Sequence, residues 1–287
     1  MKVSINIPKQ TIHRLKEVQS ILDQLHPESS PQALIVPNSP APHNNIIVFP
    51  GSFNPPTNAH LALMKQARQF AHSQIFSSSA REHHTTLLYA AMSKRTTDKE
   101  NVERPLMLDR ILLLDTLIRH RFRHTGIMLF NRGLYVEQAQ AVRNCFPNVK
   151  RLCFLVGFDK IVQILDPRYY ENRDAALFQL FALSELLVAP RGEANDDALS
   201  KLLEQPQNQP FAQHIHPLPF STAYRDISSS RVRQHSDEHI QEVPQEVQRF
   251  MLETRAYAPP LRLADGTEIN YYEERVKALE ELIKSFY

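Results

Sequence analysis

The stretch "FPGSFNPPTNAHL", residues 49–61, combines the end of an apolar run, a turn rich in proline and the start of a helical pattern. The apolar run Ile46–Phe49 has the length and composition of a buried β-strand, and helical spacing begins near Asn58. Between them, Gly51 lets a ligand approach the backbone without meeting a Cβ, and three prolines stiffen the turn. Because the new helix directs its free N–H groups into the same space, the pattern predicts a strand, an anion-binding turn and a helix.

His60 lies in the first turn of the predicted helix, where it can donate a hydrogen bond to the anion that the helix dipole attracts. The stretch contains no acidic residue, so it supplies no carboxylate to act with the histidine. The alternative is a structural turn in which Thr57 caps the helix and His60 only caps or packs. Taken alone, a strand-turn-helix segment more commonly has this structural role.

Further along the chain, apolar runs alternate with segments of helical spacing. Strands are predicted at residues 46–49, 85–92, 126–130, 151–156, 185–189 and 214–220, and helices at 58–71, 106–118, 136–145, 160–165, 175–183 and 197–204. Strands separated by helices favour an α/β fold with a doubly wound parallel sheet and right-handed crossovers. In that architecture, ligands bind beyond the carboxyl ends of the strands.

Both ends of the chain are predicted to extend this main domain, which spans residues 46–257. Residues 1–45 combine an amphipathic helix, Lys9–Leu25, with a proline-rich segment that has the composition of a linker or an extended wrap. Residues 258–287 are predicted to form a C-terminal helical extension, because apolar residues recur at helical spacing near its end.

A second polar segment, "DISSSRVRQ" at residues 226–234, is predicted to open a helix. The hydroxyls of Ser228–Ser230 can cap that helix or donate to a phosphate, and an arginine one turn later can bind phosphate oxygens with two N–H groups. Arg231 and Arg233 differ by about 200° of helix rotation, so they cannot both face one phosphate. The structural alternative is a solvated helix start, since serine runs are common.

The two segments together resemble the signatures of the nicotinamide and nicotinate mononucleotide adenylyltransferases, a family of the nucleotidyltransferase superfamily. The first signature is a G-x-F-x-P turn followed by histidine or threonine, two residues and histidine; it matches Gly51, Phe53, Pro55, Thr57 and His60. The second is I-S-S-T-x-x-R; it matches Ile227, Ser228, Ser229 and Arg233, with Ser230 in place of the threonine. Pro50 and Ala59 stand where the family usually has glycines, and Pro50 makes the turn stiffer.

The resemblance implies a Rossmann-like nucleotidyltransferase fold for residues 46–257. It implies that His60 and Arg233 are catalytic. It also implies a set of residues that bind ATP and its phosphates: Gly51, Ser52, Phe53, Thr57, His60, Ser228, Ser229, Ser230 and Arg233.

Three further segments bear on the second substrate. "RLCFLVGFDK" at residues 151–160 resembles the family's strand ending in G-x-D, which implies that Gly157 and Asp159 contact the mononucleotide and the adenosine sugar. The family's stacking tryptophan is missing, because the chain has no Trp; Tyr169 and its neighbour Tyr170 are candidate substitutes, with core packing as the alternative. Lys94, in a loop after a predicted strand, is expected near substrate phosphate.

The implied reaction is adenylyl transfer from ATP to nicotinamide or nicotinate mononucleotide, giving the dinucleotide and pyrophosphate. A mononucleotide phosphate has a second pKa of about 6, so it attacks already ionised and needs no protein base. Mg²⁺ is expected to accompany ATP, and no metal site is predicted within the chain. The alternatives are another nucleotidyltransferase of the same fold and a catalytically silent nucleotide-binding module.

Composition restricts the other partners. A formal net charge of +2 over 287 residues does not indicate bulk binding to nucleic acid or membranes. Cys145 and Cys153 lie inside apolar runs, which fits reduced thiols and favours the cytosol. No segment has the length of a signal peptide core or a membrane span. Composition does not determine the oligomeric state, so a homo-oligomer stays one of the alternatives.

Overall fold

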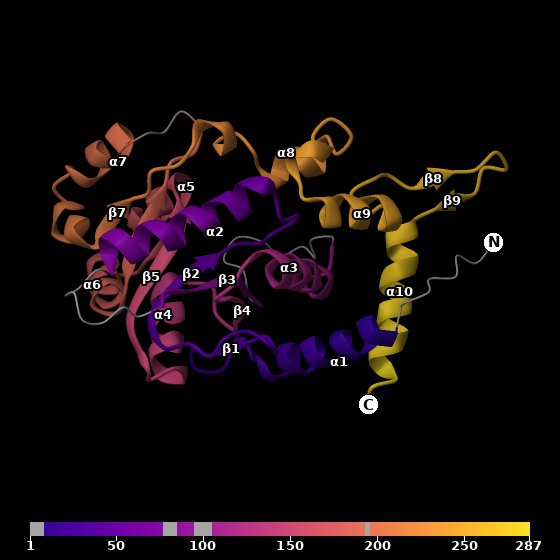
Figure 1. Cartoon of the computed structure of the whole chain (residues 1–287), viewed down its shortest axis with the longest axis horizontal. Helices are drawn as coiled ribbons and strands as arrows, with labels where there is room; N and C mark the ends of the chain where they lie inside the picture. The colour runs from indigo at the N-terminus through magenta and orange to yellow at the C-terminus, as the bar shows by residue number, and fades with distance from the viewer. Residues whose placement is uncertain (1–8, 77–84, 95–104, 193–195) are drawn as a thin grey trace.

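The computed structural model describes residues 9–76, 85–94, 105–192 and 196–287. Within these ranges a seven-stranded sheet has the order β1-β4-β3-β2-β5-β6-β7 (Figure 1). Every neighbouring pair is parallel except β1 and β4, so the doubly wound α/β fold expected from the sequence is confirmed. The strands are β1 (Ala33–Ile35), β2 (Asn44–Pro50), β3 (Leu87–Ser93), β4 (Thr125–Phe130), β5 (Val149–Gly157), β6 (Glu185–Ala189) and β7 (Ile215–Pro217).

The sheet is buried on both faces, and successive side chains of each strand point to opposite faces. Along β2, Ile47 and Phe49 belong to one apolar core, whereas Ile46 and Val48 belong to the other. The first core is covered by α1 (Lys9–Gln24), α2 (Asn58–Phe70) and α3 (Met107–Arg121). The second is covered by α4 (Tyr135–Cys145), α5 (Phe158–Leu165), α6 (Arg173–Leu183) and α7 (Asp196–Leu203).

The chain after the sheet forms α8 (Ser229–Gln234), α9 (Gln245–Thr254) and α10 (Tyr271–Lys284). Val232 of α8 and Val247 of α9 pack with Leu117 of α3 in a small apolar core of their own. A hairpin of β8 (Leu261–Arg262) and β9 (Glu268–Ile269) connects α9 to α10 and extends away from the sheet (Figure 1). None of the described helices combines the length and apolar character needed to cross a membrane.

Two sequence expectations differ from the structure in detail. The strand predicted at 214–220 is only three residues long, because Pro217 and Pro219 lack the N–H that a ladder needs. The proline-rich segment before residue 46 contributes β1, an antiparallel edge strand paired with β4. The domain boundary at residue 46 stays a prediction.

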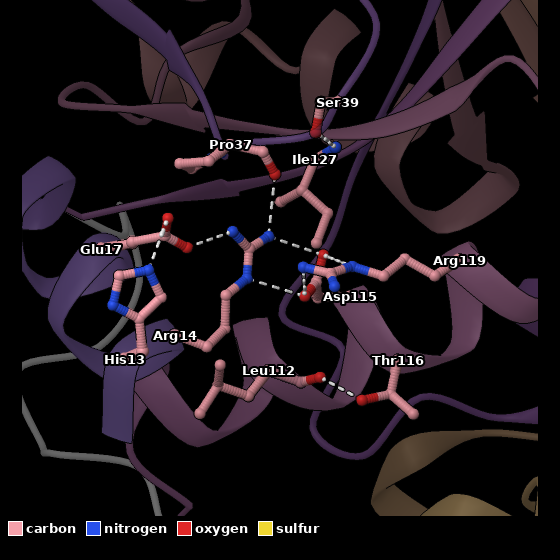
Figure 2. A network of polar contacts seen from close by, with 10 residues as sticks. All are labelled: His13, Arg14, Glu17, Pro37, Ser39, Leu112, Asp115, Thr116, Arg119 and Ile127. Carbon is pink, nitrogen blue, oxygen red and sulfur yellow. Dashed lines mark hydrogen bonds and ion pairs between the residues drawn. The ribbon is translucent and has the colours of Figure 1, made fainter. Parts of the chain in front are cut away.

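A nearly buried cation fixes the N-terminal segment. Arg14 of α1 donates to both carboxylate oxygens of Asp115 in α3, at 2.9 and 2.8 Å, and to Pro37 O at 2.8 Å (Figure 2). Glu17 accepts from the same guanidinium at 2.8 Å. The planar guanidinium therefore joins α1, α3 and the chain after β1 in one set of charge-assisted hydrogen bonds.

Close approach explains the glycine at position 126 in β4. A Cβ on Gly126 would lie 2.6 Å from Ser39 Cβ and 3.1 Å from Pro40 Cδ. Ser39 Oγ accepts a hydrogen bond from Ile127 N–H at 3.0 Å at the same place. The absence of a side chain at Gly126 therefore lets the N-terminal segment pack directly on β4.

Gly126→Ala is expected to destabilise the protein by about 1–3 kcal/mol, the usual cost of overpacking. Urea unfolding measures the change. Gly157→Ala is the matched control, because φ there is −80° and nothing lies within 4 Å of the added Cβ. Equal unfolding midpoints for the two variants would contradict the close approach at Gly126.

Candidate active site

The site lies where the strand order changes direction. β2 and β5 are neighbours in the sheet, although β3 and β4 come between them in the sequence. In doubly wound sheets, ligands bind at such a switch point, beyond the carboxyl ends of the two strands. The turn at residues 51–57 follows β2, and Gly157 ends β5. The fold therefore brings the first signature and the G-x-D segment to one edge.

The buried ring of Phe53 packs against its neighbours in the turn after β2. Gly51 N–H donates to Ala91 O at 2.9 Å, which continues the pairing with β3. Phe53 is fully buried with a φ of 45°, and its ring meets that of Phe49 edge-on at 5.4 Å between centroids. A Cβ on Gly51 would lie 3.2 Å from the Phe53 ring. Glycine at position 51 thus makes room for the phenylalanine that anchors the turn.

Two side chains from distant elements hold the next residues. Arg110 of α3 donates to Ser52 O at 2.9 Å. Tyr257, which follows α9, donates to the side-chain oxygen of Asn54 at 2.8 Å, and Asn54 is fully buried. Burial raises the pKa of Tyr257 well above its ordinary value, so its hydroxyl stays protonated and remains a donor. The first signature did not indicate either partner.

Thr57 and His60 form a reciprocal cap at the start of α2. His60 N–H donates to Thr57 Oγ1 at 3.4 Å, and Thr57 N–H donates to His60 Nδ1 at 3.0 Å. Nδ1 must therefore be unprotonated, so the neutral ring carries its proton on Nε2. Burial beside Phe53, and to a smaller extent the charge of Arg191, lower the pKa of His60 to about 4. At neutral pH His60 is a neutral Nε2–H donor. The helix cap that the sequence analysis gave as a purely structural role for Thr57 is therefore present, and it also selects this tautomer of His60.

The second signature packs directly on the first. Ser229 Oγ donates to Pro55 O at 2.7 Å, and Arg233 donates to Asn54 O at 2.5 Å. Arg233 also donates to Ser230 Oγ at 3.3 Å. A guanidinium has five N–H donors, so these two contacts leave others for a ligand. Ser228 caps α8 by accepting from Arg231 N–H at 3.2 Å.

The two arginines of the second signature point to different partners, as their spacing on the helix predicts. Arg231 donates to Asp226 O at 3.1 Å and pairs with Glu242 at 3.7 Å. Arg233 is the one that reaches the turn after β2.

The carboxylate of the G-x-D segment pairs with a cation from another segment, which the sequence analysis missed. Gly157 is the N-cap of α5, with open space where a Cβ would lie. Asp159 pairs with Arg191 at 2.7 Å, and Arg191 follows β6. Arg191 is also close enough to His60 to lower the pKa of its imidazole. The position of Arg191 in the sequence could have identified it, because Arg191 stands two residues after β6, which ends at the same edge of the sheet.

Lys94 and Tyr169 make contacts away from these groups. Lys94 Nζ donates to Leu22 O at 2.7 Å, which places the ammonium at the C-terminal end of α1. Tyr169 lies in a short 3-10 helix, Pro167–Tyr169, with 44% of its surface exposed. Tyr170 donates to Ile164 O at 2.8 Å, and burial raises the pKa of its hydroxyl to about 12. Tyr170 therefore packs against its own loop, and the substrate roles of Lys94 and Tyr169 stay predictions.

Within residues 9–76, 85–94, 105–192 and 196–287, no group of three or more His, Cys, Asp or Glu side chains is placed to hold a metal ion.

The fold and the paired signatures define a nucleotidyltransferase. A sequence model described as cytidylyltransferase-like matches residues 48–235, which is more than half of the chain. The chain belongs to the cytidylyltransferase-like family, and the enzyme class inferred from the two signatures is confirmed.

The chain is similar to one curated protein and to a solved structure. A protein of Schizosaccharomyces pombe named "Putative nicotinamide mononucleotide adenylyltransferase" is 25% identical over 187 residues, which cover 63% of this chain and 68% of that protein. A solved structure of a "Putative Nicotinate-nucleotide Adenylyltransferase" from Vibrio parahaemolyticus is 14% identical, with a TM-score of 0.39. That alignment covers 75% of this chain and 96% of the other.

The His60 imidazole is expected to titrate with a midpoint near pH 4. NMR titration measures it, with the signals assigned by their loss in His60→Gln. The unfolded chain binds this proton near pH 6.5, so the free energy of unfolding should fall as the pH drops from about 6.5 towards 4. A midpoint near 6.5 in the folded protein would contradict the burial of His60 and the influence of Arg191 on it.

Proposed function

We propose that the chain transfers the adenylyl group of ATP to the phosphate of nicotinamide or nicotinate mononucleotide. The observation that carries the proposal is the neutral His60, held by Thr57 as an Nε2–H donor beside a turn that Arg233 also contacts. Such a site offers positive charge and hydrogen-bond donors, which suit a reaction that needs no general base. The S. pombe relative's name agrees with this reaction.

The chemistry requires no base from the protein. An oxygen of the mononucleotide phosphate attacks the α-phosphorus of ATP and forms a new P–O bond. The bond from the α-phosphorus to the oxygen that bridges to the β-phosphate breaks, and pyrophosphate leaves with the electron pair. Catalysis then depends on in-line placement and on stabilising the charge that develops on the phosphates.

Each group has a role that its position permits. His60 Nε2–H and the free N–H groups of α2 donate to the phosphates of ATP, where the helix dipole also favours negative charge. Arg233 holds the turn through Asn54 O and stabilises the departing pyrophosphate with its remaining donors. Mg²⁺ enters as part of the MgATP substrate.

The mononucleotide is assigned to the edge formed by α5. The open space at Gly157 lets a ligand approach the backbone, and Asp159 accepts hydrogen bonds from sugar hydroxyls. The pair of Asp159 with the exposed Arg191 leaves both side chains within reach of solvent.

We also propose a cytosolic location, because Cys145 and Cys153 are both free thiols.

Incubation with MgATP and each mononucleotide tests the proposal, with pyrophosphate and dinucleotide as joint readouts. CTP replaces ATP in a parallel arm, because the matched family is described as cytidylyltransferase-like. Dinucleotide formed from ATP and at least one of the two mononucleotides is expected. The assignment would be overturned if neither mononucleotide supported pyrophosphate release from ATP. It would also be overturned if the reaction occurred with CTP but not with ATP.

His60→Ala is expected to lower kcat by about 10²-fold or more, the scale for a donor that acts on developing charge. The KM for ATP should change less, because the hydrogen bond strengthens in the transition state. Steady-state kinetics at saturating ATP measures the effect. A variant with wild-type kcat would remove His60 from the mechanism.

Arg233→Lys is expected to impair turnover substantially, because lysine keeps the charge but loses the planar set of N–H donors. Arg231→Lys is the matched control on the same helix, and it should be nearly neutral since Arg231 faces Glu242. Comparison of kcat for the two variants decides between them. Equal losses would mean that the second signature acts through a different side chain.

A further inference from the structure

The C-terminal helix α10 lies outside the family match at residues 48–235, yet it is joined to the first turn of α3. Arg275 donates to both carboxylate oxygens of Asp109, at 2.6 and 3.2 Å. Tyr272 donates to Asp109 Oδ2 at 2.8 Å. Asp109 and Tyr272 are each only 1% exposed. A carboxylate buried this deeply depends on both partners, because an unpaired buried charge is strongly unfavourable.

Tyr272 also fixes the start of α3. Its hydroxyl accepts a hydrogen bond from Leu106 N–H at 2.7 Å. Leu106 is the N-cap residue of α3 and makes no side-chain cap of its own. An N–H group that the helix leaves unsatisfied is therefore bound by a residue of α10.

The same turn of α3 contacts the proposed nucleotide site. Arg110, next to Asp109 in the sequence, donates to Ser52 O at 2.9 Å. Ser52 follows Gly51 in the turn after β2. Hydrogen bonds from α10 to Asp109, and from its sequence neighbour Arg110 to Ser52 O, therefore connect α10 to the backbone of the proposed phosphate-binding turn.

The far end of α10 is anchored as well. Tyr287 donates to Asp23 of α1, and Lys16 of α1 lies over the Phe286 ring at 5.5 Å. Helix α1 is in turn fixed to the middle of α3 by Arg14 and Asp115 (Figure 2). Both ends of α10 are thus connected to α3, one directly and one through α1.

We propose that Tyr272 and Arg275 are positioning residues for the nucleotide-binding turn, acting on Ser52 through Asp109 and Arg110. The consequence for catalysis rests on the proposed function. The consequence for the conformation of the turn does not.

Two variants test the proposal, one at each end of the series. Tyr272→Phe removes the hydroxyl and keeps the ring, and Arg110→Met removes the contact with Ser52 O while leaving the Asp109 pair in place. Each should lower kcat by about tenfold or more, because a displacement of about 1 Å at a reacting group can cost about 10²-fold. The double variant should lose no more than the worse single variant, since both changes act through one connection.

Hydrogen exchange of the Gly51 amide provides a readout that needs no reaction. That amide donates to Ala91 O, and its exchange should speed up by about tenfold in both variants. Exchange of the Val48 amide, inside β2, should stay unchanged. Lys277→Met, on the exposed side of α10, is the matched control and should leave kcat and Gly51 exchange as in the wild type.

The outcomes separate this proposal from the proposed function. Wild-type Gly51 exchange in folded Tyr272→Phe and Arg110→Met would overturn the positioning role, whatever the enzyme's substrate. If Tyr272→Phe does not fold, Arg275→Lys takes its place, because it keeps the charge beside Asp109 and removes the two-pronged hydrogen bond. Multiplicative losses of kcat in the double variant would also overturn it, because they would mean independent effects. Faster Gly51 exchange in a protein without adenylyl transfer would support the positioning role and reject only the proposed function.

Discussion

The candidate site depends on the hydrogen bonds by which α8 holds the turn after β2. Ser229 donates to Pro55 O and Arg233 to Asn54 O, across separations of 174 and 179 residues. Asn54 and Pro55 are both buried, so their carbonyls need partners within the protein, and the bond from Arg233 is charge-assisted. The intervening sheet brings the two signatures to one edge, and these contacts fix their mutual position. Substrate phosphates can then meet both signatures at once.

Side chains of helix α3 also contact the elements around this turn. Its side chains pair with α1 through Asp115, with α10 through Asp109 and with the turn itself through Arg110. Removing one partner of a buried ion pair is costly, although replacing the whole pair with apolar side chains is often neutral. A buried ion pair is therefore weak evidence of added stability, and under the positioning proposal the contacts of Asp109 act by fixing the geometry of the turn.

The sequence predicts the sheet and both signatures because their signals are local. Apolar runs, turn residues and helical spacing show where β2, α2 and α8 begin and end. Arg191 and Tyr257 were missed because their roles come from packing between distant segments. Lys94 stands at the expected edge, but α1 packs nearby and accepts its ammonium group. β1 was missed because three residues between prolines carry too little periodicity to predict a strand.

In the proposed mechanism, adenylyl transfer occurs in one in-line step, with donors and cations from the protein and no covalent intermediate on it. The most direct measurement is the stereochemical course at the α-phosphorus, with ATP made chiral there by a sulfur substitution. A single displacement by the mononucleotide phosphate predicts inversion of configuration in the dinucleotide. Retention would contradict the account, because it requires two displacements and a covalent adenylyl-enzyme that the proposed roles of His60 and Arg233 do not include.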